Sequence, residues 1–173
     1  MKYVRLLTMT GLALALGACD EPFDSQRPDV PPPPTQGIQA FLQVDNDQAT
    51  PGQQIRVFVA VQFGVEEDLK LGSYTGALYF DPEVLAWKSD IAINDGLRVT
   101  NAANAPGEVR FAGASARGFE DNLLYRGEFT VKAASYMEGL RFEMEELTAA
   151  ESLADLASGL VTEPRVFLRT GRN

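Results

Sequence analysis

A period of two in the placement of apolar residues constrains the fold of this chain most, because it recurs along nearly all of the sequence after residue 37. Successive side chains of a β-strand point to opposite faces of a sheet, so this period indicates strands that bury one face. The clearest run has apolar side chains at Ile55, Val57, Val59, Val61 and Phe63. Sheets with one apolar face stack in pairs, so the pattern predicts an all-β sandwich of eight or nine strands.

One segment departs from that period and predicts a short helix over residues 149–157. Thr148 followed by Glu151 fits a capping box, and Gly159 is a suitable residue to end the helix. Between them, apolar residues recur at helical spacing, at Leu153, Ala154, Leu156 and Ala157. The alternative for this segment is an irregular loop before the last strand.

Composition excludes several kinds of active site from this chain. It has 173 residues, no histidine and a single cysteine. A Ser-His-Asp triad, a Cys-His pair, a histidine-ligated metal and an internal disulfide therefore cannot form. The net charge of −9 gives no basic surface for nucleic acid. We expect a binding module rather than an enzyme, with no catalytic residue and no cofactor.

The N-terminus predicts export and lipid attachment. Lys2 and Arg5 precede an uncharged apolar run from Leu6 to Ala18, which is shorter than the roughly 20 residues of a membrane span and typical of a signal peptide. The run leads into Leu-Gly-Ala-Cys, which resembles the lipobox of bacterial lipoproteins, with Cys19 as the lipidated residue. Residues 1–18 are then the signal peptide, and acyl chains on Cys19 attach the protein to the lipid bilayer.

Residues 19–37 are expected to link the lipid anchor to the domain. Six of the ten prolines fall in this segment, and consecutive prolines favour an extended polyproline II conformation. Residues 38–173 are predicted to form one domain. The lipobox predicts a place at the bacterial cell envelope, anchored to the inner or the outer membrane and on the extracytoplasmic side. Asp20 resembles a signal for retention at the inner membrane.

Four motifs in succession resemble the cohesin family. They are Ala49 to Gln53 before a strand, Gly76 to Leu85 with an aromatic-Asp-Pro corner, Val109 to Gly113, and Leu124 to Ala133. Together they cover nearly all of residues 38–170. The resemblance implies a jelly-roll sandwich, related to some carbohydrate-binding modules. It also implies a role as receptor for dockerin modules, which carry paired calcium-binding loops.

The same resemblance implies where a partner binds. In the family the dockerin lies on one sheet and contacts polar residues of the strand before the Asp-Pro corner, which correspond here to Ser73 and Thr75. Cellulosomal cohesins carry Asn and Asp at these two positions. Alternation places Ser73, Thr75, Ala77 and Tyr79 on one side of this strand and Tyr74, Gly76, Leu78 and Phe80 on the other. The second set is more apolar and is expected in the core, so the first set is the candidate for binding a protein partner.

Two other functions are alternatives to a protein receptor. Exposed aromatic rings can bind polysaccharide by stacking, and Phe41 and Phe58 lie on the otherwise polar sides of their strands. This placement also fits the second face of a central strand that a loop covers. Trp87 follows a corner and is expected to fill the core. The other alternative is a structural lipoprotein subunit of an envelope complex.

Two groups of acidic and amide residues offer oxygen ligands for a structural calcium ion. They are Asp45 with Asn46 and Asp47, and Asp90 with Asn94 and Asp95. Turn chemistry explains these residue types equally well, and neither group has the spacing of an EF-hand.

A larger acidic group lies near the C-terminus, where Arg141 is the one offsetting cation. Its carboxylates are Glu138, Glu143, Glu145, Glu146, Glu151 and Asp155. The group is either a solvated face or a docking surface for a basic partner.

Overall fold

The computed structural model of the chain describes residues 32–65 and 68–168. The predicted signal peptide, Cys19, Asp20 and the linker up to residue 31 lie outside the described residues. Within the described part, no helix is long and apolar enough to cross a bilayer.

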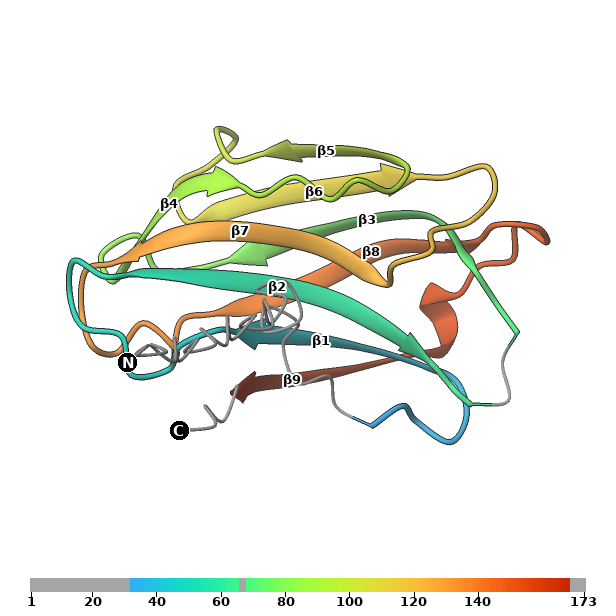
Figure 1. Cartoon of the computed structure of the whole chain (residues 1–173), viewed down its shortest axis with the longest axis horizontal. Coiled ribbons are helices and arrows are strands. Elements are labelled where there is room, and N and C mark those ends of the chain that lie inside the picture. Colours follow the sequence, from blue (N-terminus) through green and yellow to red (C-terminus); the bar gives the residue numbers. More distant parts are fainter. Residues whose placement is uncertain (1–31, 66–67, 169–173) are drawn as a thin grey trace, which may run out of the picture.

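Nine strands of the described part form the predicted sandwich of two sheets (Figure 1). They are β1 (Ile38–Val44), β2 (Gln54–Phe63), β3 (Leu71–Tyr79), β4 (Leu85–Asp90), β5 (Leu97–Asn101), β6 (Glu108–Ala114), β7 (Leu123–Val131), β8 (Arg141–Ala149) and β9 (Leu160–Leu168). One sheet has the order β4-β7-β2-β1-β9 and the other has the order β5-β6-β3-β8. Paired strands are antiparallel except β1 and β9, which are parallel. The predicted fold class is confirmed.

The core lies between the two sheets, where the apolar sides of the strands meet. Ile55 and Val57 of β2 are buried there as the alternation predicts. The ring of Tyr125 on β7 stacks on Phe111 of the opposite sheet, with centroids 5.3 Å apart. Trp87 packs against this core as expected, and its Nε1 donates a hydrogen bond to Tyr125 Oη at 3.2 Å. Full burial of one large apolar side chain contributes about 1.5–3 kcal/mol to stability.

Close packing of β3 against β6 depends on the glycine at position 113. Gly113 lies opposite Tyr74 in the ladder, and a Cβ atom there would lie 2.5 Å from the Tyr74 ring. The space that a side chain would fill is therefore occupied by the Tyr74 ring. The Tyr74 hydroxyl donates a hydrogen bond to the carbonyl of Leu124 on β7 at 2.7 Å, which ties the two sheets together.

The sequence predicts a helix over residues 149–157. Instead, β8 continues to Ala149 and a turn follows it, so that prediction is wrong. Thr148, the expected N-cap, pairs with Ser73 in the β3–β8 ladder, and this pairing outweighs the local capping signal. Leu153 has a φ of 53°, a left-handed conformation that interrupts a right-handed helix. One short 3₁₀ helix, η2 (Ala157–Gly159), precedes β9.

Candidate binding face

The side of the β5-β6-β3-β8 sheet that points away from the core forms a broad surface, which we call the outer face. Strand register arranges its side chains in four rows that cross the strands. In order from β5 toward β8, the rows are Leu97, Ala114, Ser73 and Thr148; Val99, Ala112, Thr75 and Glu146; Asn101, Arg110, Ala77 and Glu143; and Glu108, Tyr79 and Arg141. All four candidate residues of β3 therefore lie on this face.

The inner side of β3 is occupied as the sequence predicts. Tyr74 and Leu78 are buried in the core. Phe80 follows the end of the strand and is only partly buried, with its ring edge-on to Phe129 at a centroid distance of 5.2 Å. The assignment of the two sides of β3 is confirmed.

The outer side of β3 offers three of its four candidates to a partner. Ser73, Thr75 and Tyr79 are partly exposed. Ala77 is fully buried although it belongs to the outer face. Its neighbours in both ladders are long charged residues, whose aliphatic stems can cover a methyl group. Ala77 is thus part of the floor of this face and presents no surface of its own.

Arg110 on β6 joins carboxylates from two strands. Its guanidinium donates hydrogen bonds to Glu108 Oε1 at 3.1 Å and to both carboxylate oxygens of Glu145 at 2.5 Å. The hydrogen bonds to Glu145, and then those to Glu108, raise the pKa of Arg110 above its ordinary value. Arg110 was not among the predicted residues of this face, because the sequence does not show which strands lie on either side of β3.

Tyr79 is covered by a charged neighbour. The guanidinium of Arg141 lies 4.0 Å from the centroid of the Tyr79 ring and donates a hydrogen bond to Glu143 Oε1 at 2.7 Å. Desolvation of the hydroxyl, followed by the nearby Glu143 carboxylate, raises the pKa of Tyr79 above its ordinary value. The ring is therefore not a bare aromatic platform, and a partner meets Tyr79 and Arg141 as one unit.

The corner of the outer face at β5 is apolar and open. Leu97 is 70% exposed and Val99 is 60% exposed. The neighbouring outer positions on β6 are Ala114 and Ala112, whose small side chains leave the two larger ones prominent. The alternation at these positions indicates a strand, but it does not show that the apolar side faces solvent.

The inner side of β5 carries the residue that closes the gap between the two sheets. Arg98 Nη1 donates hydrogen bonds to Tyr74 Oη at 2.6 Å and to the carbonyl of Leu123 on β7 at 2.5 Å. Its Nη2 lies 3.6 Å from Asp95 Oδ2. The guanidinium also lies over the Phe119 ring, 4.4 Å from its centroid. Arg98 thus satisfies polar groups of the opposite sheet where β4 no longer pairs with β7.

Two of the residues that offer oxygen ligands for calcium have structural roles. Asp95 Oδ2 accepts hydrogen bonds from the backbone N–H groups of Glu120 and Asp121, at 2.8 Å and 3.1 Å. Asp45 Oδ1 accepts the N–H of Arg56 at 2.8 Å. Among the described residues, no three or more acidic, histidine or cysteine side chains gather in a way that could hold a metal ion. Asp45 and Asp95 thus stabilise the backbone of segments that lie next to them in the fold.

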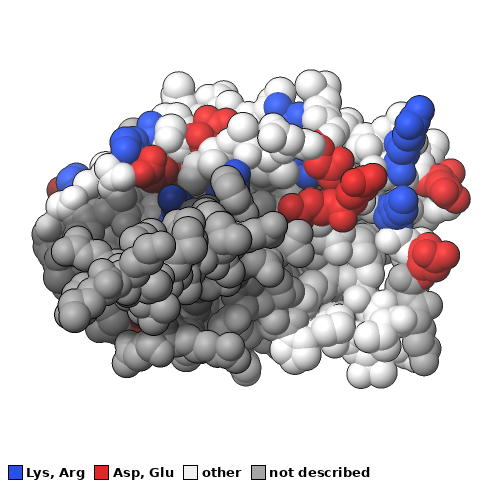
Figure 2. Space-filling view, viewed as in Figure 1, with Lys and Arg blue, Asp and Glu red and all other residues white. Residues whose placement is uncertain are grey.

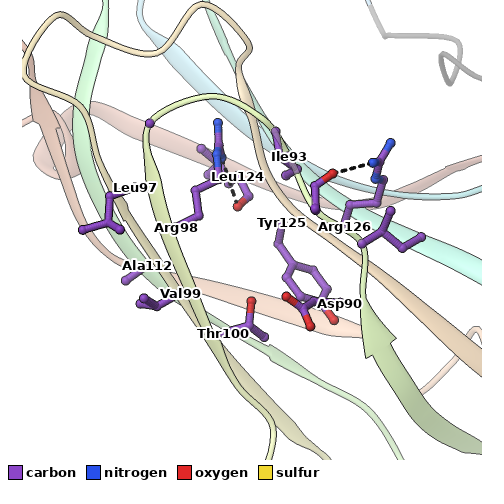
Figure 3. A pocket seen from close by; sticks show the side chains of 13 residues that line it. Asp90, Ile93, Leu97, Arg98, Val99, Thr100, Ala112, Leu124, Tyr125 and Arg126 are labelled. Carbon is purple, nitrogen blue, oxygen red and sulfur yellow. Dashed lines mark hydrogen bonds between the residues drawn. The ribbon is translucent and has the colours of Figure 1, made fainter.

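A cavity of about 280 Å³ opens between the end of β4 and β5 (Figure 3). In that view Tyr125, Thr100 and Asp90 lie toward one end, and Arg98 and Arg126 lie toward the other. Burial lowers the pKa of Arg126 below its ordinary value. Asp90 is the single carboxylate in the lining, whereas glycoside hydrolysis uses a pair of carboxylates across the scissile bond. This cavity does not bring together such a pair.

The aromatic pair considered for polysaccharide binding is not accessible. Phe41 and Phe58 are 1% and 4% exposed, respectively. β1 and β2 are therefore buried on both sides where these residues lie, which corresponds to the alternative of a covered central strand. Stacking of sugar rings needs an open aromatic face, and these two residues do not supply one.

The acidic group near the C-terminus is more balanced in space than in sequence, because Arg110 reaches it from β6. Figure 2 shows acidic and basic side chains side by side on the surface that it displays. On the outer face, Glu143 and Glu145 are both ion-paired. Glu146 is exposed and forms no ion pair with a described residue. Glu146 is therefore the carboxylate of the outer face that can pair with a cation of a partner.

Comparison with known proteins gives no match to a protein-family profile and none to a curated protein. Solved cohesin structures do share the fold. A cohesin module of a family 33 glycoside hydrolase from Clostridium perfringens matches with a TM-score of 0.54 and 17% identity, over 75% of this chain and 100% of that one. A chain of a type I cohesin–dockerin complex from Clostridium thermocellum matches with a TM-score of 0.56 and 11% identity, over 74% of this chain and 90% of that one.

A third solved structure is a non-cellulosomal cohesin from the archaeon Archaeoglobus fulgidus. It matches with a TM-score of 0.51 and 16% identity, over 72% of this chain and 86% of that one. At such identities the likeness shows the fold and not the ligand. The resemblance to cohesins that the four motifs predict is therefore confirmed at the level of the fold.

Proposed function

We propose that this protein is a non-catalytic lipoprotein of the bacterial cell envelope whose sandwich holds a protein partner on the outer face. The observation that carries the proposal is the open apolar corner of that face, where Leu97 and Val99 are 70% and 60% exposed. Exposed apolar side chains in contact with one another mark interaction surfaces more often than isolated ones do. Solved structures with the same fold include cohesins in complex with dockerins, which supports a protein as the partner.

The centre of the face suits close approach by a second protein. Ser73, Thr75, Ala112 and Ala114 are small and lie side by side on β3 and β6. A flat area of small side chains lets another backbone come near, and the hydroxyl groups of Ser73 and Thr75 can donate and accept hydrogen bonds there. The partner is a dockerin-type module or a subunit of an envelope assembly.

Polysaccharide is not part of the proposal. Among the aromatic residues that could stack on sugar rings, Phe41 and Phe58 are buried. Tyr79 is stacked under Arg141, which occupies the ring face that a sugar would need.

The anchor in this proposal is the acylated Cys19. Two or more acyl chains give stable attachment to a bilayer, and the proline-rich residues 20–37 would hold the domain on the extracytoplasmic side. Cys19→Ser should abolish labelling of the protein by a clickable fatty acid in cells. Label that persists in this variant would contradict the lipid anchor. It would not bear on the binding face, which has its own test.

Affinity purification of the full-length protein from native membranes tests the binding role. Ser73→Arg places a long cation among small neighbours and should remove any specific partner. Arg56→Ala, at an exposed position of β2 in the other sheet, is the control and should retain it. Partners that co-purify equally with both variants would show that the outer face is not the site.

A further inference from the structure

The outer face has two chemically different ends on β5 and β8. At β5, Leu97 and Val99 expose apolar side chains. At β8, the outward residues are Arg141, Glu143, Glu145, Glu146 and Thr148, of which three are carboxylates. Between these ends, the first two rows contain only alanine, serine and threonine. A single partner element that crosses the strands along these rows would meet both ends.

The charges of the outer face leave an acidic surplus. It carries four carboxylates, from Glu108, Glu143, Glu145 and Glu146, and two guanidinium groups, from Arg110 and Arg141. Both guanidinium groups already pair with carboxylates of the same face. An anionic partner would therefore meet repulsion without a free cation to receive it, whereas a cationic group can pair with Glu146.

The register gives the distance between the two anchor points. Val99 and Glu146 stand at opposite ends of the row that contains Ala112 and Thr75. Adjacent strands are about 4.8 Å apart, so three strand spacings separate the two positions by about 14 Å. Only small side chains lie between them.

We infer that the partner presents an exposed apolar side chain for the Leu97–Val99 corner and a lysine or arginine about 14 Å away for Glu146. This inference rests on the proposed function, because it assigns the chemistry of the partner at the same face. The apolar contact provides affinity through buried area, and the Glu146 contact selects partners by charge. Acidic or uniformly polar protein surfaces are rejected.

Peptide selection on the full-length protein tests this chemistry directly. A phage-displayed library of random peptides is selected on the wild type and counter-selected on Ser73→Arg, which blocks the outer face without changing Leu97, Val99 or Glu146. The selected peptides should combine apolar residues with lysine or arginine. They should bind the double variant Leu97→Ser/Val99→Ser at least about tenfold more weakly, since two apolar anchors are lost. Glu146→Lys should weaken them severalfold, and wild-type binding should weaken as salt is added.

Two surface variants serve as matched controls. Glu83→Lys makes the same charge change in the exposed turn between β3 and β4, and Val65→Ser removes an apolar side chain that is 69% exposed beyond β2. Both should bind the selected peptides as the wild type does. Acidic selected peptides, or peptides that bind the double variant as tightly as the wild type, would overturn the inference.

Failure of the inference is distinguishable from failure of the proposed function. A membrane partner that is lost on Ser73→Arg but retained by both Glu146→Lys and Leu97→Ser/Val99→Ser would keep the binding face and overturn its assigned chemistry. A partner that is retained by all three variants would overturn both.

Discussion

Arginine side chains have different roles in two regions of this sandwich, the edge between β4 and β5 and the outer face. At the edge, the Arg98 side chain is 12% exposed and is enclosed by Tyr74, Phe119 and carbonyl groups of β7. On the outer face, Arg110 and Arg141 are 37% and 60% exposed, and each pairs with an exposed carboxylate, Glu145 or Glu143. Exposed ion pairs contribute little to folding, whereas breaking a buried one leaves a charge without a partner. The edge therefore stabilises the fold, and the outer face can change its contacts without unfolding the protein.

The largest expected effect is on the inner side of β3. Tyr74→Ala should lower the free energy of unfolding by about 3–5 kcal/mol, because it leaves a cavity in the core and removes the hydroxyl that joins the sheets. Tyr74→Phe keeps the ring and should cost only about 1–2 kcal/mol. Urea unfolding followed by far-UV circular dichroism measures both. A loss below about 1 kcal/mol for Tyr74→Ala would contradict the importance of this edge.

The second largest effect is expected at Arg98, the cation at the edge between β4 and β5. Arg98→Met keeps much of the side-chain volume but removes the cation beside Asp95 and the donor to the Leu123 carbonyl, so it should lower the free energy of unfolding by about 3 kcal/mol. Arg117→Met is the control at an exposed position, where the expected change is within about 0.5 kcal/mol. Equal melting temperatures for the two variants would show that Arg98 is not structural.

Adjacent residues at the end of β3 sharpen the comparison within one strand. Phe80→Ala should lower the free energy of unfolding. The loss should be below about 3 kcal/mol, the least expected for a fully buried phenylalanine, because Phe80 is only partly buried. Tyr79→Ala should leave the fold intact and weaken partner binding by more than about 1 kcal/mol. Thermal melting and co-purification are measured for both variants. If Tyr79→Ala melts the domain and Phe80→Ala does not, the two sides of β3 have been exchanged.

The smallest effect is expected from the ion pairs of the outer face. Glu145→Gln removes the bidentate partner of Arg110 and should lower the melting temperature slightly in dilute buffer. Salt screens exposed charges, so wild type and variant should melt together in molar sodium chloride. A large decrease that persists at high salt would mean that this pair is structural, as Arg98 is.

The sequence was sufficient to predict the sandwich and the two sides of β3, because both depend on the period of two that strand geometry imposes. It was not sufficient for the segment after β8. Thr148 and Glu151 have the local pattern of a capping box, yet the β3–β8 ladder takes Thr148 into a strand. Pairing between distant segments decided the conformation there, and a single sequence does not show that pairing.

The binding face was predictable only along one strand. Ser73, Thr75 and Tyr79 follow from alternation, but Arg110 lies beside them only because β6 is the neighbour of β3. β5 shows a further limit: alternation separates Leu97 and Val99 from Arg98 without showing which side is buried. The aromatic rings and bare carbonyls around Arg98 make the polar side the inner one.

The central claim is that the outer face contacts a protein partner in the envelope. Its most direct test is a photo-crosslinking amino acid placed at position 75, in the centre of that face, in the full-length protein in living cells. Position 65, where Val65 is 69% exposed beyond β2, is the control. We predict a specific protein adduct from position 75 that is absent from position 65 and lost on Ser73→Arg. No adduct from position 75, or the same adducts from both positions, would contradict the claim.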